Sequence, residues 1–212
     1  AGKLSIMASG SEAAFAAARP ALDAMAETFD VGADRIQMTL SAYMIGLAIA
    51  QLLCGPLSDR FGRRPVLLTG LVVFLVASLA IMQVSSLETL WGLRFVQALG
   101  GGACVVNSAA IVRDCFSGRE AAKVMSTMAM IMMLAPLVAP AVGSGLLYIG
   151  GWWLIFVFLA VYAGFLLWLL GTRLPETRDM SLPAASPRQV ISNYASVLKH
   201  REGMGYICAV AA

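Results

Sequence analysis

Five long apolar stretches, separated by short polar connections, dominate the chain. They cover approximately residues 39–53, 66–84, 87–112, 124–147 and 152–170. A helix of about 20 predominantly apolar residues is long enough to cross the hydrocarbon core of a bilayer. The pattern therefore predicts five membrane-spanning helices, and the short connections predict antiparallel neighbours.

The segment before these stretches, residues 4–29, has a mixed character. It is rich in alanine, but it also carries Glu12, Arg19, Asp23 and Glu27. Each ionisable group at the bilayer centre costs roughly 2.5–3.5 kcal/mol on insertion scales. We expect an atypical first span with a polar face toward a cavity. The alternative is a signal peptide, in which Lys3 precedes an apolar stretch and residues 16–18 resemble a cleavage site.

The composition agrees with a membrane protein that contacts lipid on most sides. Of the 212 residues, 59% are hydrophobic and 13% are charged, against about 45–50% and about 25% in soluble domains. The mean hydropathy is +0.80. These values exclude a disordered chain and argue against a soluble enzyme. The net charge is only +3 and the basic residues form no patch with aromatics, so nucleic acid is not an expected partner.

Lysine and arginine in the connections predict the orientation of the helices. Three segments are basic: two connections and the carboxy-terminal tail. The first connection holds Arg60, Arg63 and Arg64, the second holds Arg113, Arg119 and Lys123, and the tail holds Arg173, Arg178, Arg188, Lys199 and Arg201. All three segments fall on one side if the five helices alternate, and the opposite side holds only Arg35 in a loop. Cytoplasmic loops carry the excess of lysine and arginine. The three segments, including the carboxy-terminal tail, are therefore predicted to be cytoplasmic.

The domain organisation follows from the same pattern. Residues 1–172 are predicted to form a six-span bundle that includes the atypical first segment. Residues 173–205 contain prolines, serines and alternating charge, which is typical of a linker. Residues 206–212 are apolar but too short to cross a bilayer, so we interpret them as the start of a truncated seventh span.

The connection between residues 55 and 65 carries the strongest motif, Gly-Pro-Leu-Ser-Asp-Arg-Phe-Gly-Arg-Arg-Pro. Gly55 and Pro56 are expected to end the preceding helix, and Gly62 allows a close reversal of the chain. Asp59 can pair with an arginine or cap a helix. A simple positive loop that anchors the helices is the alternative, but an anchor needs no fixed glycine, acid and proline positions.

This pattern resembles the signature G-x-L-x-D-R-x-G-R-R/K between spans 2 and 3 of the major facilitator superfamily. The matching residues are Gly55, Leu57, Asp59, Arg60, Gly62, Arg63 and Arg64. The resemblance implies a conformational gate, in which the acid and the arginines latch two six-helix halves together on the cytoplasmic side. We expect the second, carboxy-terminal half to lie outside this chain.

The stretch 87–112 places an arginine inside an apolar helix. Arg94, Ala98 and Gly102 share one helix face, and Gln97 lies beside it. An ionisable residue inside a span indicates a functional site, and small residues allow close helix packing. The alternative is that Arg94 extends to the outer interface. The pattern R-x-x-Q-x-x-G resembles the fourth-span motif of proton-coupled members, which implies a role of Arg94 and Gln97 in proton coupling.

The stretch 124–147 contains Pro136, Pro140 and Gly143 within Ala-Pro-Leu-Val-Ala-Pro-Ala-Val-Gly. Two prolines four residues apart remove two helical hydrogen bonds and predict a bend. The stripe Ala135, Ala139 and Gly143 is expected to pack closely against a neighbour. A kink with no role in specificity is the alternative.

The proline stretch is similar to the fifth-span motif of drug–proton antiporters, and its second Ala-Pro resembles the Bcr/CflA-type multidrug subfamily. Two further segments resemble that subfamily: Ile111-Val112-Arg113-Asp114 at the end of the fourth span, and Leu174-Pro175-Glu176-Thr177 after the sixth. The resemblance covers about residues 25–177. It departs from the subfamily pattern in the first segment, where alanines occupy the acid and tyrosine positions.

The resemblance implies an all-α membrane protein, the six-helix amino-terminal half of a major facilitator fold built as 3+3 inverted repeats. We expect a proton-coupled antiporter in the bacterial inner membrane that exports drugs or other small amphipathic compounds. Its partners are the bilayer, protons, a small-molecule substrate and the missing half. Alternatives are a metabolite or sugar facilitator and a truncated, non-transporting remnant. The sequence contains no nucleophile–base pair, phosphate loop or metal cluster, so neither enzyme activity nor a cofactor is expected.

Overall fold

The computed structural model describes residues 12–178 together with Gln189, Ser192 and Ser196. The described part is helical, and it contains no strand. Its helices are α2 (Glu12–Phe29), α3 (Ala33–Phe61), α4 (Arg63–Ile81), α5 (Leu87–Cys115), α6 (Gly118–Ile149) and α7 (Trp153–Arg173). The predicted start of a seventh span at 206–212, and nearly all of the predicted linker beyond residue 178, lie outside the described residues.

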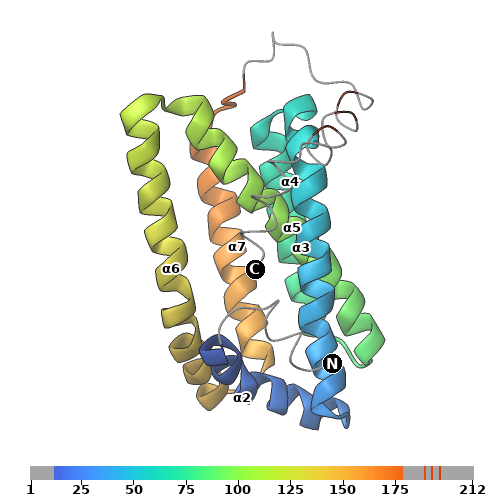
Figure 1. Ribbon diagram of the computed structural model, residues 1–212. Helices are drawn as coiled ribbons and strands as arrows, with labels where there is room; N and C mark the ends of the chain where they lie inside the picture. Colours follow the sequence, from blue (N-terminus) through green and yellow to red (C-terminus); the bar gives the residue numbers. More distant parts are fainter. Residues whose placement is uncertain (1–11, 179–188, 190–191, 193–195, 197–212) are drawn as a thin grey trace.

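Helices α3 to α7 run side by side in alternating directions (Figure 1). The principal contacts are α3 with α5, α4 with α5, and α4 with α7. Four of these helices, α3, α4, α5 and α7, are long and apolar enough to cross a membrane, and α6 is a fifth if the two parts on either side of its bend count as one span. The five predicted apolar stretches correspond to these five helices.

The two ends of the bundle differ in charge, as the sequence predicts. The ends of α3, α5 and α7 and the starts of α4 and α6 lie together at the top of Figure 1. This end carries Arg60, Arg63, Arg64, Arg113, Arg119 and Arg173, and we call it the arginine end. The opposite end, which we call the α2 end, is where α2 lies.

Helix α2 runs across the α2 end rather than alongside the other helices (Figure 1). Leu22 and Met25 are buried, whereas Arg19 and Asp23 are exposed and form an ion pair of 3.9 Å between Arg19 Nε and Asp23 Oδ2. The apolar side of the helix therefore faces the bundle and its charges face outward. Helix α2 is not among the helices apolar enough to span, so the expected first span, like the alternative signal peptide, stays a prediction.

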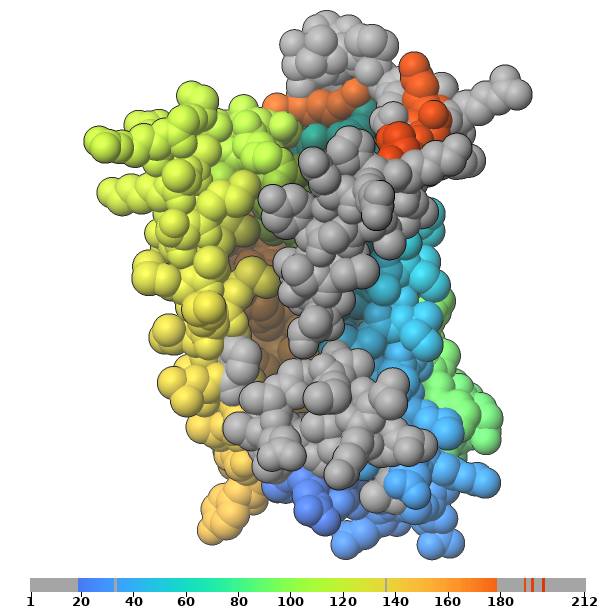
Figure 2. All heavy atoms as spheres, in the orientation of Figure 1, coloured from blue at the N-terminus to red at the C-terminus, as the bar shows by residue number. Residues whose placement is uncertain are grey.

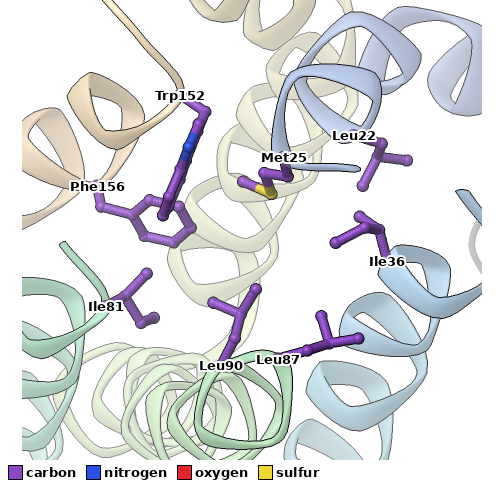
Figure 3. Close-up of a cluster of buried hydrophobic side chains, with 8 residues drawn as sticks. All are labelled: Leu22, Met25, Ile36, Ile81, Leu87, Leu90, Trp152 and Phe156. Atoms are coloured by element: carbon purple, nitrogen blue, oxygen red, sulfur yellow. The ribbon is translucent and has the colours of Figure 1, made fainter. Parts of the chain in front are cut away.

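A hydrophobic cluster fixes α2 to the ends of four other helices (Figure 3). Its members are Leu22, Met25, Ile36, Ile81, Leu87, Leu90, Trp152 and Phe156. The indole Nε1 of Trp152 donates a hydrogen bond of 3.0 Å to Thr28 Oγ1, and its ring lies 5.8 Å from that of Phe29. Burial of aromatic and aliphatic side chains with a satisfied indole N–H is a stable arrangement. Together these contacts close the α2 end of the bundle.

Small residues bring α5 close to both α3 and α4, as predicted for the glycine-rich face. Ala98 and Gly102 face Gly46 and Ala50 of α3, and Gly100 faces Gly70 of α4. A Cβ atom on residue 100 would lie 2.5 Å from the Gly70 carbonyl oxygen, which is too close for any larger residue. These contacts hold α5 in a fixed position between its neighbours.

The prediction that Gly55 and Pro56 end the second span is wrong. Helix α3 continues through both residues to Phe61, with Pro56 inside it. A proline removes a single backbone donor, which a long helix can tolerate as a local irregularity. The true end is set by Gly62, whose φ of 98° and ψ of 156° are not helical.

Helix α6 stands at the edge of the molecule and exposes most of its apolar side chains (Figure 2). Met133 and Leu137 are 80% and 78% exposed. The predicted stripe of Ala135, Ala139 and Gly143 does not pack against a described helix of this chain, because Ala135 and Ala139 are exposed and a Cβ on Gly143 would meet nothing within 4 Å. That expectation is wrong for contacts within the described chain.

Candidate functional site

The connection between α3 and α4 is a turn at a single glycine. Gly62 has a φ of 98° and follows Phe61, the last residue of α3, while Arg63 begins α4. A Cβ atom at residue 62 would also lie 2.5 Å from Oε2 of Glu176. The positive φ favours glycine, and any side chain at this position would have to displace the Glu176 carboxylate. The predicted reversal at Gly62 is confirmed.

The Arg63 guanidinium joins the ends of three helices. Its Nη1 lies 2.6 Å from Asp59 Oδ1 and donates a 2.6 Å hydrogen bond to Ser58 Oγ, while its Nε donates to Asp114 Oδ2 at 3.0 Å. The Arg63 side chain is only 13% exposed. Ser58 and Asp59 belong to α3 and Asp114 to α5, so one guanidinium with several donors links three elements. We call Ser58, Asp59, Arg63 and Asp114 the gate cluster.

The other motif residues lie around the gate cluster. Arg64 Nη2 donates a 2.7 Å hydrogen bond to the carbonyl oxygen of Gly171 near the end of α7, where a cation is favoured by the helix dipole. The Arg60 guanidinium lies 5.5 Å from the centroid of the Phe61 ring. Gly55 has no neighbour that would exclude a Cβ, and Arg113 is exposed at the end of α5. The structure therefore brings Asp59, Arg63 and Asp114 into one network, and the Gly55 carbonyl joins it by accepting a 3.0 Å hydrogen bond from Ser58 Oγ. Arg64 lies beside this network, and Arg113 lies outside it.

Glu176 caps the start of α4, which has no side-chain cap of its own. Its carboxylate accepts hydrogen bonds from the backbone N–H groups of Arg63 at 2.8 Å and Arg64 at 3.2 Å. The backbone N–H groups of Thr177 and Arg178 also donate to the Glu176 carboxylate, both at 3.1 Å. Partial burial alone would raise the pKa of Glu176, but the four N–H donors outweigh it and lower the pKa below its ordinary value. An anion at a helix N-terminus is favoured.

We expect Glu176→Gln to loosen the start of α4. A neutral amide offers one acceptor oxygen where the carboxylate offers two, so the amides of Arg63 and Arg64 lose protection. Hydrogen exchange of a peptide that covers residues 61–66 should be faster by about tenfold. Because the folded pKa is depressed, protection in the wild type is complete above the ordinary carboxyl pKa and is lost as pH falls through the lower, folded value.

The matched control for this measurement is Glu120→Gln. Glu120 is an exposed acid in the first turn of α6 at the same end of the bundle. This change should leave exchange of the 61–66 peptide unaltered. Equal exchange in Glu176→Gln and the wild type would show that Glu176 does not hold the start of α4.

The second candidate site lies in the interior, around Arg94 of α5. Arg94 Nη1 donates a 3.1 Å hydrogen bond to Gln97 Oε1, and Gln97 Nε2 donates to Ser78 Oγ of α4 at 2.8 Å. Gln97 and Ser78 have no exposed surface. Arg94 is therefore directed toward Gln97, one turn farther from the α2 end. This direction opposes the alternative in which Arg94 extends to the outer interface.

Two aromatic rings flank the guanidinium of Arg94. Its Cζ lies 4.9 Å from the ring centroid of Phe156 in α7 and 5.6 Å from that of Tyr43 in α3. A cation over an aromatic face is attracted by about 0.5–2 kcal/mol, more where water is excluded. Within the described stretches 39–53, 66–84, 87–112, 124–147 and 152–170 the only acid is Glu88, which is exposed in the first turn of α5 at the α2 end. Within this part of the chain the positive charge is held by an amide and two rings, not by a carboxylate.

The proline stretch bends α6 as predicted. The segments Gly118–Ala135 and Leu137–Ile149 are inclined by 41°, and the break falls at Pro136. Pro140 lies one turn farther on and is partly buried. Loss of two backbone hydrogen bonds explains the bend. Helix α6 stands apart from α3, α4 and α5 in Figure 1, and the structure does not bring the predicted stretch of Pro136, Pro140 and Gly143 beside Arg94 of α5.

Five contributors to the two sites were not predicted from the sequence: Tyr43, Ser58, Ser78, Phe156 and Glu176. Ser58 lies inside the motif at a variable position, and Glu176 lies in a segment noted only for its resemblance. One signal could have pointed to Glu176. The first turn of α4 contains no acid, so its free backbone N–H groups need an acceptor from elsewhere in the chain. Tyr43, Ser78 and Phe156 are single polar or aromatic residues in apolar helices, and no local pattern distinguishes them.

Comparison with known proteins identifies the family. Residues 4–212 match the model of the Major Facilitator Superfamily. The chain is 34% identical over 193 residues to a bicyclomycin resistance protein homolog of Haemophilus influenzae, which is 91% of this chain and 48% of that protein. It is 41% identical over 143 residues to a chloramphenicol resistance protein of Pseudomonas aeruginosa, covering 67% of this chain and 34% of that one.

A multidrug transporter MdfA of Yersinia pestis is 32% identical over 185 residues, which is 86% of this chain and 45% of the relative. The chain thus spans about half the length or less of these relatives. Its helices, their apolar lengths and the gate cluster agree with the amino-terminal half of such a protein. This chain is a multi-pass membrane protein that belongs to the major facilitator superfamily.

Proposed function

We propose that this chain is the amino-terminal half of a proton-coupled antiporter that exports drugs or other small amphipathic compounds across the bacterial inner membrane. The observation that carries the proposal is the guanidinium of Arg94, held in the interior of the bundle by Gln97 and two rings. Charged residues inside a span mark substrate or ion pathways. The names of the similar proteins, which refer to drug resistance and multidrug transport, support the substrate class.

A proton exchanged for drug supplies the free energy for export. One elementary charge that crosses the membrane gains about 2.3 kcal/mol per 100 mV. Arg94 stays charged in a protein, so it cannot itself load and release a proton. Its proposed role is to bias a nearby acid by electrostatics. The only acid in the five described apolar stretches is Glu88, which is exposed in the first turn of α5 and not directed into the bundle interior. We therefore propose that the acid comes from the first segment or from the carboxy-terminal half.

The gate cluster is proposed to control access from the cytoplasm. It ties the ends of α3, α4 and α5 through Arg63, and Arg64 adds the end of α7. Alternating access requires the helices of one half to move against the other. Charge networks at helix ends that exist in one state only act as switches. We propose that the cluster favours one of these states, together with residues of the missing half.

The proposed function is tested by drug susceptibility of cells that express the full-length protein. Growth in bicyclomycin, chloramphenicol and ethidium is compared with that of cells carrying an empty vector, with and without an ionophore that dissipates the proton gradient. The proposal expects resistance that the ionophore removes. Resistance that persists with the ionophore would oppose proton coupling. No resistance, with uptake of a sugar instead, would favour a facilitator.

The proposed topology makes a separate prediction about thiol labelling. Cys115 is exposed at the arginine end, and Ser85 is exposed at the α2 end. With Cys54, Cys104 and Cys208 replaced by serine, Cys115 should resist an impermeant maleimide added to intact cells. A Ser85→Cys variant that also lacks Cys115 should react. Both thiols should react in permeabilised cells, and the reverse pattern in intact cells would overturn the orientation.

A further inference from the structure

The hydrogen-bond chain that reaches Arg94 begins on a neighbouring helix, at Ser78 of α4. The Ser78 hydroxyl donates to the carbonyl oxygen of Phe74 in its own helix at 2.7 Å. A serine hydroxyl has a single hydrogen, so Ser78 can only accept a bond from Gln97. The bond from Gln97 Nε2 to Ser78 Oγ measures 2.8 Å, and both side chains have no exposed surface.

This arrangement fixes the orientation of the Gln97 amide. With its nitrogen committed to Ser78, Gln97 presents its oxygen to Arg94 Nη1 at 3.1 Å. In the flipped amide, Nε2 would face a guanidinium that has donors only, and the Oε1 atom would face the Ser78 oxygen. Neither contact would be a hydrogen bond while Ser78 donates to Phe74. The single hydrogen of Ser78 thus decides which end of the amide meets Arg94.

The rings of Phe156 and Tyr43 cannot replace this constraint. They lie 4.9 Å and 5.6 Å from the guanidinium carbon, and attraction of a cation to a ring face tolerates sliding along the ring. A hydrogen bond at 3.1 Å has both a length and a direction. Among the described residues, the Gln97 oxygen is the directional partner of Arg94.

We propose that Ser78 is a positioning residue for Arg94, which acts through the Gln97 amide and sets where the guanidinium lies during proton coupling. The inference rests on the proposed coupling role of Arg94. In Ser78→Ala the buried Gln97 nitrogen loses its acceptor, so the amide is free to turn and Arg94 loses its fixed partner. The charge of Arg94 remains, and only its position changes.

The test uses inverted membrane vesicles that contain the full-length protein, with chloramphenicol and ethidium as probes. Two quantities are measured for each variant: uphill accumulation driven by an imposed pH gradient, and downhill movement of the same drug without one. Ser78→Ala should lower uphill accumulation on the order of tenfold, the effect of leaving a buried polar group unpaired. Downhill movement should stay close to that of the wild type. A purely structural defect would lower both quantities together.

Ser108→Ala is the matched control. The Ser108 hydroxyl also donates to a carbonyl of its own helix, that of Cys104 at 2.8 Å, and it is partly buried in α5. It therefore differs from Ser78 in lacking the described bond to a second helix. Ser108→Ala should keep both quantities at the wild-type level.

A double-mutant cycle with Gln97→Leu tests whether Ser78 acts on Arg94 through the Gln97 amide. Because Ser78 acts through Gln97, Ser78→Ala should cause no further loss in the Gln97→Leu background. Additive losses, or an unchanged uphill accumulation in Ser78→Ala, would overturn the positioning role. If Arg94→Ala is normal, or the wild type accumulates neither drug, the proposed function itself has failed. The two failures therefore give different results.

Discussion

Asp59→Asn is expected to abolish drug export by the full-length protein while the protein remains inserted in the membrane. The substitution keeps the shape of the side chain but removes the charge that lies 2.6 Å from Arg63 Nη1. Hydrogen bonds to charged groups contribute about 1.5–3 kcal/mol. Arg63, which is only 13% exposed, keeps its bonds to Ser58 and Asp114. The ends of α3, α4 and α5 therefore stay linked, but the arrangement seen in this structure is less stable relative to the alternative state of the transporter.

The magnitude follows from the two-state character of a gate. If Asp59 stabilises one state by about 2 kcal/mol, its loss changes the ratio of the two states by about 30-fold. A transporter must visit both states in every cycle, so a shift of this size in either direction slows turnover by a similar factor. Export assayed by drug efflux from energised cells should fall accordingly, with the amount of protein in the membrane unchanged.

Asp34→Asn is the control for this substitution. Asp34 is an exposed acid in the first turn of the same helix, α3, at the α2 end of the bundle, and it is absent from the gate cluster. Its change should leave export intact. Unchanged export in Asp59→Asn would show that the connection between α3 and α4 serves only to anchor the helices at the membrane surface.

The sequence predicted the helices well, because the apolar length of a span is a property of the chain itself. The stretch 152–170, for example, corresponds to α7 (Trp153–Arg173) within three residues at either end. The boundaries of the helices were predicted less well where a single residue determines the end of a helix. Pro56 looks like a helix breaker, yet α3 passes through it and ends at Phe61, since only Gly62 takes a conformation that the helix cannot accommodate.

The gate cluster was predicted in part. Asp59 and Arg63 are four residues apart across the turn and pair as expected, and Asp114 was marked by its resemblance at the end of the fourth span. Glu176 could not be predicted as their neighbour, because 112 residues separate it from Arg64 and only the fold brings α7 beside α4. The Ser78–Gln97 bond was hidden for a similar reason: it depends on the rotation of α4 about its axis, which glycine contacts with α5 determine.

The position of α2 shows the limit of periodicity. Its charged residues argued both for a cavity-lining span and for a cleaved leader, and neither pattern indicates a helix that lies across the end of a bundle. Leu22 and Met25 provide the apolar side that such a helix needs, and their partners come from α3, α4, α5 and α7. A contact with several helix ends at once has no signature in the segment itself.

Arg94→Ala is expected to eliminate uphill, proton-driven export, and Arg94→Lys is expected to lose most of it. Alanine removes both the charge and the hydrogen bond to Gln97. Lysine keeps the charge, but its ammonium lacks the planar fork and the flat surface that stacks against Phe156 and Tyr43. Uphill export should therefore be lower in Arg94→Ala than in Arg94→Lys, and in both variants it should be below about one tenth of the wild-type value.

Substrate binding should survive both substitutions, because the proposed role of Arg94 is to bias the acid that carries the proton. Downhill movement of chloramphenicol or ethidium in vesicles should therefore continue, and it should no longer respond to the imposed pH gradient. The ratio of uphill accumulation to downhill movement isolates coupling from expression and folding. Arg35→Ala is a suitable control, since Arg35 is an exposed arginine at the start of α3 and lies outside the Arg94 site. If Arg94→Ala supports a normal proton-driven gradient of drug, the guanidinium serves packing between α3, α5 and α7, and the assignment of coupling to this residue is wrong.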